Sequence, residues 1–292
     1  MPVGTTADFV MTRDDIIKAA LRKMNVLRGG GSPTTSQLTN ASEALNVLIR
    51  QEDAKNTKQS KDLWALSESH LILVANQVMY GTATGLESNI MDIETAHFRD
   101  SGGDDSSLSI LTKAQYETIA NKNDTGDSIS VFLKQDRLLA SQVLNIWPSP
   151  SSVGTTSEVT GTDTLNYSCI MGHTSANLNK PITGADYKLY WRQVGSSGSA
   201  WATGTSYTNG RLIRYTYKRP LFDFDLSTDN PDMPSAWNNF LIWVLASNLA
   251  PEYSTDIETQ KVLDFKAREA RADLFNMTVE PTTSIHNKGV FF

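Results

Sequence analysis

Apolar residues recur at helical spacing near the start of the chain. Thr12 is a candidate N-cap, and Asp15 stands three residues on in the position of a capping box, before apolar positions at intervals of three and four. A second segment of this kind opens at Pro33 and Thr34. The pattern predicts two helices that form an antiparallel hairpin across the glycines at residues 29–31.

The same spacing returns near the end of the chain. An apolar run that starts at Trp237 predicts a helix that ends before Pro251, because proline cannot continue a helix. Thr255 is a candidate cap for a last helix with one narrow apolar face, formed by Leu263, Ala267, Ala270 and Leu274. Phe265 and Phe275 lie off this face, and we expect them to be half exposed; contact with a second surface is the alternative.

The pattern between these helices changes to short strands. Strands are expected at residues 71–79 with a bend near Asn76, and at 93–98, 129–133 and 142–147. The last two would form a hairpin that turns near Asp136. Residues 101–107 (SGGDDSS) predict an exposed loop, and residues 109–120 predict a short helix with Tyr116.

Residues 151–210 differ in character from both flanks. Ser, Thr, Gly and Asn dominate, with isolated aromatic residues and almost no helical periodicity. This composition predicts a small inserted all-β module, of a size at which a self-sufficient core is marginal. We expect the strands on either side, residues 142–147 and 212–217, to pair as a β-hairpin across the insertion.

The predicted fold is therefore α+β: a helical bundle with a β-hairpin extension and a small inserted all-β domain. The predicted organisation is a discontinuous domain of residues 1–150 and 211–292, with the module at 151–210 between its parts.

Composition narrows the functional classes. The net charge is -6, from 26 Lys and Arg against 32 Asp and Glu, which disfavours free DNA binding but is compatible with lining a channel for DNA. The single cysteine, Cys169, excludes an internal disulfide and a cysteine-based zinc site, and we expect it to be buried. No signal peptide or membrane span is predicted, so a soluble protein made in the cytoplasm is expected.

Residue patterns that carry catalysis are missing from the sequence. The four histidines, His70, His97, His173 and His286, lack metal-ligand spacing, and no nucleophile-elbow, zinc-protease or P-loop pattern occurs. The carboxylate pairs Asp104/Asp105 and Asp223/Asp225 are expected to be solvated loop residues. The sequence thus predicts neither an enzyme nor a cofactor or metal site.

The two ends of the chain, taken in order, resemble a known family. At the front stand "TRDDIIKAALRKMNVL" and "SPTTSQLTNASEALNVLIRQ", and at the back "YKRPLFDFDLSTDNPDMPSAWNNFLIWVLASNLAPEYS". Over residues 10–150 and 211–280 the chain resembles the head-to-tail adaptors of tailed bacteriophages, also called head-completion or tail accessory proteins. The inserted module departs from the smaller members of that family.

The resemblance implies a structural virion protein. It implies a dodecameric ring that docks on the portal protein, extends the DNA channel without sequence-specific DNA binding, and receives tail nozzle or fibre proteins at its other end. It also implies that the C-terminal segment reaches the portal, and Val290, Phe291 and Phe292 are the candidate docking residues.

The inserted module resembles, more weakly, small carbohydrate-binding appendages of phage proteins. The stretches are "NYSCIMGHTSANLNKP" and "YKLYWRQVGSSGSAWATGTSYTNG". The candidate sugar-stacking rings are Tyr190, Trp191, Trp201 and Tyr207. The alternative, which we favour, is that the same rings form the core of the module, because large aromatic residues dominate small cores.

Two other functions follow from the module. The first is recognition of a virion surface or a host glycan through residues 151–210. The second is glycan hydrolysis, which would need two carboxylates about a sugar cleft. The module offers only Glu158, Asp163 and Asp186 without any pattern around them, so hydrolysis is disfavoured.

Overall fold

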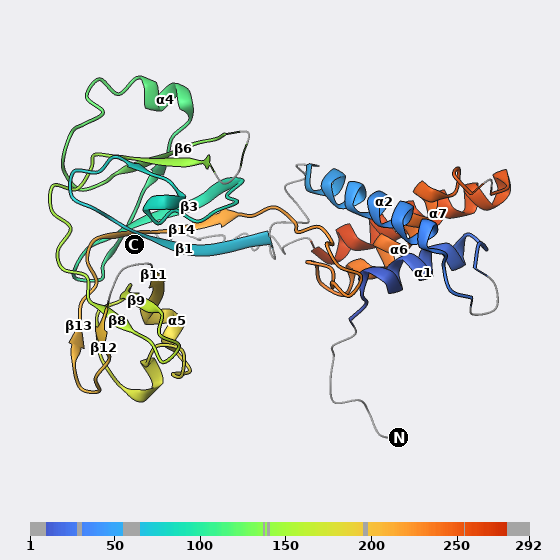
Figure 1. Ribbon diagram of the computed structural model, residues 1–292. Helices are drawn as coiled ribbons and strands as arrows, with labels where there is room; N and C mark the ends of the chain where they lie inside the picture. Colours follow the sequence, from blue (N-terminus) through green and yellow to red (C-terminus); the bar gives the residue numbers. More distant parts are fainter. Residues whose placement is uncertain are drawn as a thin grey trace, which may run out of the picture. The chain divides into compact units, whose positions relative to one another are not determined.

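A computed structural model describes residues 10–27, 31–54, 65–136, 138, 141–194, 198–253 and 255–278 (Figure 1). The chain forms two compact units, one of Met1–Ala65 with Pro220–Phe292 and one of Leu66–Arg219. We call them the helical unit and the β unit. The predicted α+β class is confirmed, but the chain divides at other positions than predicted, because the strands before residue 150 form a unit with the insertion.

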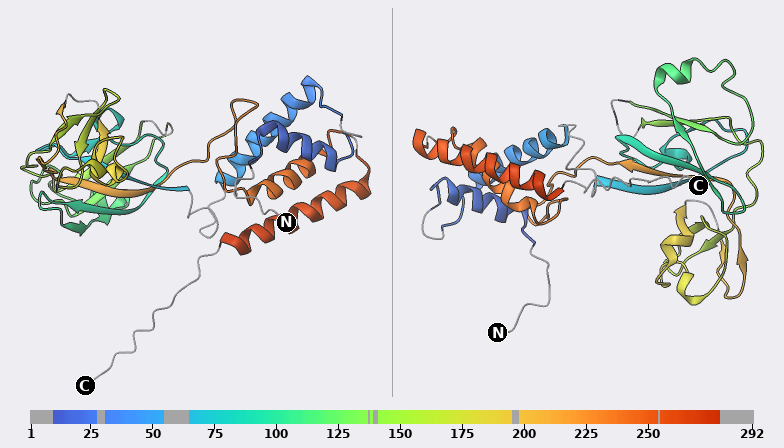
Figure 2. Two further views of the ribbon diagram at one scale, coloured as in Figure 1. Left: turned by 90° about the horizontal axis from the view of Figure 1, so that it is seen from below. Right: turned by 180° about the vertical axis from the view of Figure 1, so that it is seen from behind.

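The helical unit contains four principal helices around one apolar core (Figure 2). They are α1 (Arg13–Lys23), α2 (Thr35–Ala54), α6 (Trp237–Leu249) and α7 (Ile257–Thr278). All four were expected from the sequence pattern, and the predicted apolar face of α7 is buried. Helices from the two ends of the chain therefore complete a single core.

Local capping fixes where these helices start. The Thr12 hydroxyl accepts a hydrogen bond from the backbone N–H of Asp15, whose carboxylate accepts one from the Thr12 N–H, so the predicted capping box is confirmed. The predicted cap of α7 is wrong by one residue. The carboxylate of Asp256 accepts from the Thr259 N–H at 2.8 Å, while the Thr255 hydroxyl donates to the Ala250 carbonyl.

An extended segment, residues 221–226, packs along α2; we call it the strap. Asn46 both donates to and accepts from the backbone of Phe224, at 3.0 Å in each case. Arg50 donates to the carbonyl of Leu221 and pairs with Asp223 at 2.6 Å. Asp223 is exposed outside the helices and strands, as expected, although it is ion-paired. This ion pair lowers the pKa of Asp223.

The β unit is built on two four-stranded sheets. The first has the order β1 (Leu66–Ile72), β14 (Leu212–Lys218), β3 (Asp92–Arg99), β4 (Asp105–Ser107). The second has the order β2 (Met79–Tyr80), β7 (Val143–Trp147), β6 (Ser130–Lys134), β5 (Ser109–Ile110). Buried residues from both sheets, among them Leu71, Phe98, Ile146 and Tyr215, form one core. The short helices η1 (Thr82–Thr84) and α4 (Lys113–Glu117) lie in the connections.

Strand pairing corrects two predictions. The expected hairpin between the strands that flank the insertion does not form, because β7 pairs with β6 and β2, whereas β14 pairs with β1 and β3. The expected loop at residues 101–107 is a loop only in its first part, since β4 pairs with β3. The bend near Asn76 and the hairpin of β6 and β7 are confirmed.

The insertion forms a small module within the β unit. One sheet has the order β11 (Trp191–Val194), β9 (Asn166–Cys169), β8 (Glu158–Thr160), β12 (Ser199–Ala200), and β10 (His173–Thr174) pairs with β13 (Ser206–Tyr207). Two short helices, η3 (Asn177–Asn179) and α5 (Tyr187–Tyr190), interrupt the otherwise β structure. Cys169 is buried as expected, and burial raises the pKa of its thiol to about 12.

Candidate interaction sites

Two of the four candidate sugar-stacking rings belong to the core of the module. Trp191 and Tyr207 are only 3% and 7% exposed, and their ring centroids lie 5.0 Å apart in an edge-to-face arrangement. The Trp191 indole N–H donates to the Asn179 carbonyl at 2.7 Å, and the Tyr207 hydroxyl accepts from the Ala202 N–H at 2.9 Å. Neither ring has an open face for a sugar.

The other two rings, Tyr190 and Trp201, are partly buried against the same cluster. His173 lies 4.5 Å from the Tyr190 ring centroid, and the Lys180 ammonium lies 5.4 Å from that of Trp201. A hollow of about 340 Å³ lies beside Trp201 and Lys180. The packing favours the alternative in which the rings hold the module together.

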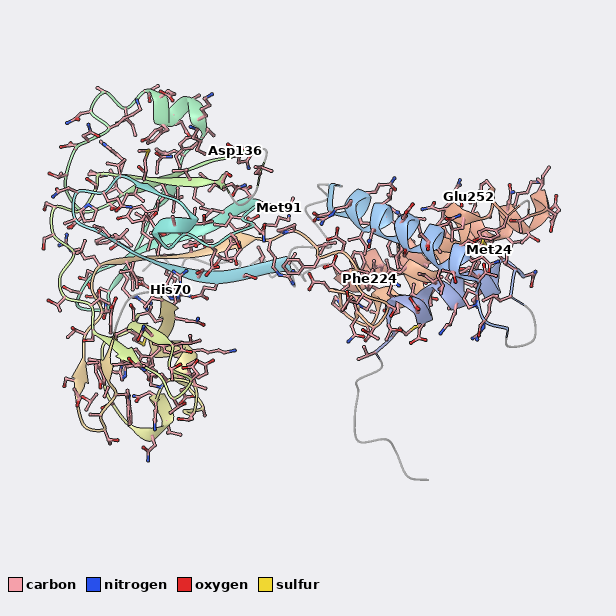
Figure 3. All side chains as sticks on the ribbon, in the orientation of Figure 1. Met24, His70, Met91, Asp136, Phe224 and Glu252 are labelled. Carbon is pink, nitrogen blue, oxygen red and sulfur yellow. The ribbon has the colours of Figure 1, made fainter. Side chains whose placement is uncertain are left out.

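A larger hollow lies between the module and the first sheet, and we call it the junction pocket. It measures about 520 Å³ and is lined by His70 and by charged residues that include Glu68, Glu87, Arg99, Arg192 and Arg214. Figure 3 shows the side chain of His70, a residue of β1, on the side of the strand that faces the module. Because β1, β3 and β14 are neighbours in the first sheet, charged side chains of all three meet on the face that the module covers.

Ion pairs connect the side chains in the wall of this pocket. Arg99 donates to both oxygens of Asp105, at 2.7 and 2.8 Å, and to the carbonyl of Ile170 in the module at 3.1 Å. Arg214 pairs with Glu68 and, at 3.3 Å, with Asp105. The expectation that Asp105 is a solvated loop residue is therefore wrong, because the pairing of β4 with β3 places it opposite Arg99.

Further hydrogen bonds tie the module to the sheets. Arg192 of the module donates to the Glu87 carboxylate at 2.9 Å and to the Gly85 carbonyl at 3.0 Å. The Asn209 side chain donates to the Asp100 carbonyl and accepts from the Gly172 N–H, both at 2.8 Å. These bonds fix the module on the sheet.

The electrostatics of the pocket follow from burial and pairing. Burial, together with the neighbouring Arg99, Arg192 and Arg214, lowers the pKa of His70 to about 4, although Glu68 opposes the shift. The hydrogen bonds from Arg99 lower the pKa of Asp105. At neutral pH the His70 imidazole is therefore uncharged, and the Asp105 carboxylate is ionised and paired with Arg99. The junction pocket therefore has the chemistry of a structural joint.

The second sheet carries a different hollow, which we call the α4 cleft. It measures about 900 Å³, and its apolar surface comes from Met79, Ile110, Tyr116 and Phe132. Tyr116 of α4 stacks on Phe132 of β6 with ring centroids 4.9 Å apart. Lys113, Lys122 and Lys134 stand around this surface. The sequence pattern did not reveal the cleft, because its side chains come from six elements that are spread along the chain.

The helical unit exposes large apolar side chains on several elements. Phe265 on α7 is 64% exposed, as expected, and Val262 one turn before it is exposed as well. Phe222 and Leu226 point outward from the strap, and Val47 is exposed on α2. The Phe275 side chain and the candidate docking residues Val290, Phe291 and Phe292 lie outside the described residues.

The described part of the chain contains neither a metal-binding cluster nor a membrane-spanning helix. No group of three or more His, Cys, Asp or Glu side chains there could hold a metal ion. Across the same residues, the structure contains no helix with the length and apolarity to span a membrane.

No protein-family model matches the chain, and no curated protein matches it.

Proposed function

We propose that this chain is a structural protein of a tailed-phage particle. Copies of it form a ring that docks on the portal protein, carries the tail nozzle or fibres and extends the channel through which DNA leaves the head. The protein acts through its interfaces and catalyses no reaction. Its net charge of -6 suits a channel wall that must not retain DNA phosphates.

The order of the structural pieces supports the proposal. Two helices from the front of the chain and two from the back complete one core, and the β unit is inserted between them. The resemblance to head-to-tail adaptors implies a helical bundle, and it covers both ends of the chain that supply these helices. The inserted module adds a substructure that is fixed on the β unit rather than loosely tethered.

The observation that carries the proposal is the exposed apolar surface of the helical unit. Exposed valine, leucine and phenylalanine side chains lie on α7, on the strap and on α2. Full burial of such a side chain is worth about 1.5 to 3 kcal/mol, and the part still exposed here accounts for roughly half of that. A closed ring needs two different surfaces on each copy, and separate apolar elements can supply them.

Sedimentation with portal rings tests the proposal. The protein and portal rings from the same phage would be mixed and separated on a glycerol gradient, and we expect the protein to move with the portal. The double variant Val262→Asp/Phe265→Asp is expected to lose this co-sedimentation. Leu165→Asp, at an exposed position of the module, serves as the matched control and should retain it. A folded wild-type protein that stays at the top of the gradient would contradict the portal-binding role.

A further inference from the structure

The α4 cleft presents apolar surface that the described part of the β unit leaves open. Met79 is 63% exposed and Ile110 is 38% exposed, and both line the cleft beside the Tyr116–Phe132 stack. Concave apolar surface with a polar rim marks a binding site more often than scattered exposed residues do. The cleft is large enough to hold one or two side chains of a partner.

Charges around the cleft are unbalanced toward the positive. Lys122 pairs with Glu117 at 3.6 Å and lies 5.5 Å from the Tyr116 ring centroid. Lys113 and Lys134 are exposed, and neither has an ion-pair partner among the residues that the structure describes. Asp92 and Glu117 also line the cleft, so three ammonium groups stand against two carboxylates, and the Asp92 carboxylate accepts a hydrogen bond from the N–H of Ile93 at 2.9 Å. The two free ammonium groups favour an anionic partner.

The walls of the cleft are held in place before any partner arrives. A capping box fixes the start of α4, with the Thr112 hydroxyl accepting from the Gln115 N–H and the Gln115 side chain accepting from the Thr112 N–H. Lys122 donates to the carbonyl of Ile119 at 3.1 Å and so secures the chain after α4. A preformed site loses little conformational freedom on binding.

We propose that the α4 cleft binds an acidic segment of another protein that carries an aromatic or large aliphatic anchor. The anchor enters between Met79, Ile110 and Phe132, and the acidic side chains on either side of it meet Lys113 and Lys134. A nucleic acid fits less well, since two free ammonium groups beside an apolar hollow are few for its closely spaced phosphates. Under the proposed function the segment belongs to a tail protein; the binding chemistry itself does not depend on that function.

Binding of labelled peptides to the full-length protein tests this inference. The probe is a fluorescein-labelled peptide with the sequence EDEFDLED, followed by fluorescence anisotropy at low ionic strength. Two further peptides serve as comparisons: EDESDSED lacks the anchors, and KRKFKLKR reverses the charges. We expect saturable binding of the first peptide, and at least tenfold weaker binding of the other two.

Variants of the protein separate the cleft from other surfaces. Lys113→Glu/Lys134→Glu is expected to weaken binding of EDEFDLED at least tenfold, because both free cations are reversed. Lys188→Glu, at an exposed position of the module, is the matched charge control and should bind as the wild type does. Ile110→Asp is expected to weaken binding through loss of the apolar contact, and circular dichroism would check that each variant is folded.

Several results would overturn the inference. They are unchanged affinity in the double lysine variant, equal binding of the anchor-free peptide, and equal binding of the basic peptide. Co-sedimentation with portal rings is measured separately, so a cleft that binds no acidic peptide would leave the proposed portal role standing. Conversely, peptide binding without portal binding would sink only the adaptor role.

Discussion

The two hollows of the β unit, the junction pocket and the α4 cleft, differ in the residues that line them. The junction pocket is lined by charged residues, and each of its guanidinium groups at Arg99, Arg192 and Arg214 has a carboxylate partner within the unit. The α4 cleft is lined by apolar rings and aliphatic side chains, with Lys113 and Lys134 around them. The charged junction pocket therefore joins two parts of the β unit. The apolar α4 cleft is the one that we propose binds a partner.

The largest expected effect on stability comes from removing the Trp191 side chain. This ring belongs to the module core and also lines the junction pocket. Trp191→Ala deletes a ring that is almost fully buried and lines the pocket, and should lower the free energy of unfolding of the module by about 3 to 5 kcal/mol. Urea unfolding followed by circular dichroism would measure it. Trp201→Ala, at a partly buried ring, should cost clearly less. Equal costs would mean that the two rings are not divided between core and surface as described.

Breaking the central ion pair of the joint comes next. Arg99→Met leaves the Asp105 carboxylate with its weaker contact to Arg214 and removes the bond to Ile170, so the free energy of unfolding should fall by about 3 kcal/mol. Arg50→Met is the matched control, because Arg50 and Asp223 form a largely exposed pair. It should cost no more than about 1 kcal/mol. A neutral Arg99→Met would show that the pocket is not a joint.

The joint should also weaken in acid. His70 has a folded-state pKa of about 4, below its ordinary value of 6.5, so the unfolded chain binds the proton more readily between these two values. Stability that is present above pH 6.5 is therefore lost as the pH falls toward 4, by up to roughly 3 kcal/mol. Charged groups that face His70 are Glu68 on β1, Arg99 on β3, Arg192 on β11 and Arg214 on β14.

The variant His70→Gln isolates this titration. Its free energy of unfolding, measured by urea titration at several pH values, should change less steeply between pH 6.5 and 4 than that of the wild type. Asp105 adds a loss of stability in the same direction at lower pH, because its pKa is also depressed in the folded state. The same slope in both proteins would mean that His70 is not held neutral in the pocket.

The smallest expected effect on stability lies at the α4 cleft. Lys113→Glu/Lys134→Glu changes two exposed residues that lack ion-pair partners in the described part of the chain, so the free energy of unfolding should move by less than about 0.5 kcal/mol. Thermal unfolding would measure it. A large loss would mean that these lysines stabilise the fold and do not await a partner.

Local patterns allowed the helical unit to be predicted well. The Thr12 capping box and the apolar face of α7 depend on residues three or four positions apart, which is within the reach of sequence periodicity. The cap at Thr255 was misplaced because Asp256 beside it is an equally good capping residue.

Long-range pairing limited the prediction of the β unit. The partner of β14 is chosen by contacts with β1 and β3, far away in the sequence, so the expected hairpin with β7 was wrong. The role of Asp105 depends on its register opposite Arg99. No local pattern could have assembled the α4 cleft, since strands of two residues, such as β2 and β5, leave no periodic signal.

Electron cryo-microscopy of portal rings mixed with this protein tests the central claim most directly. The account predicts a second ring stacked coaxially on the portal, with one copy of the chain for each portal subunit and an open channel along the shared axis. Portal rings without added density, in a sample where both proteins are intact and folded, would contradict the proposed adaptor role.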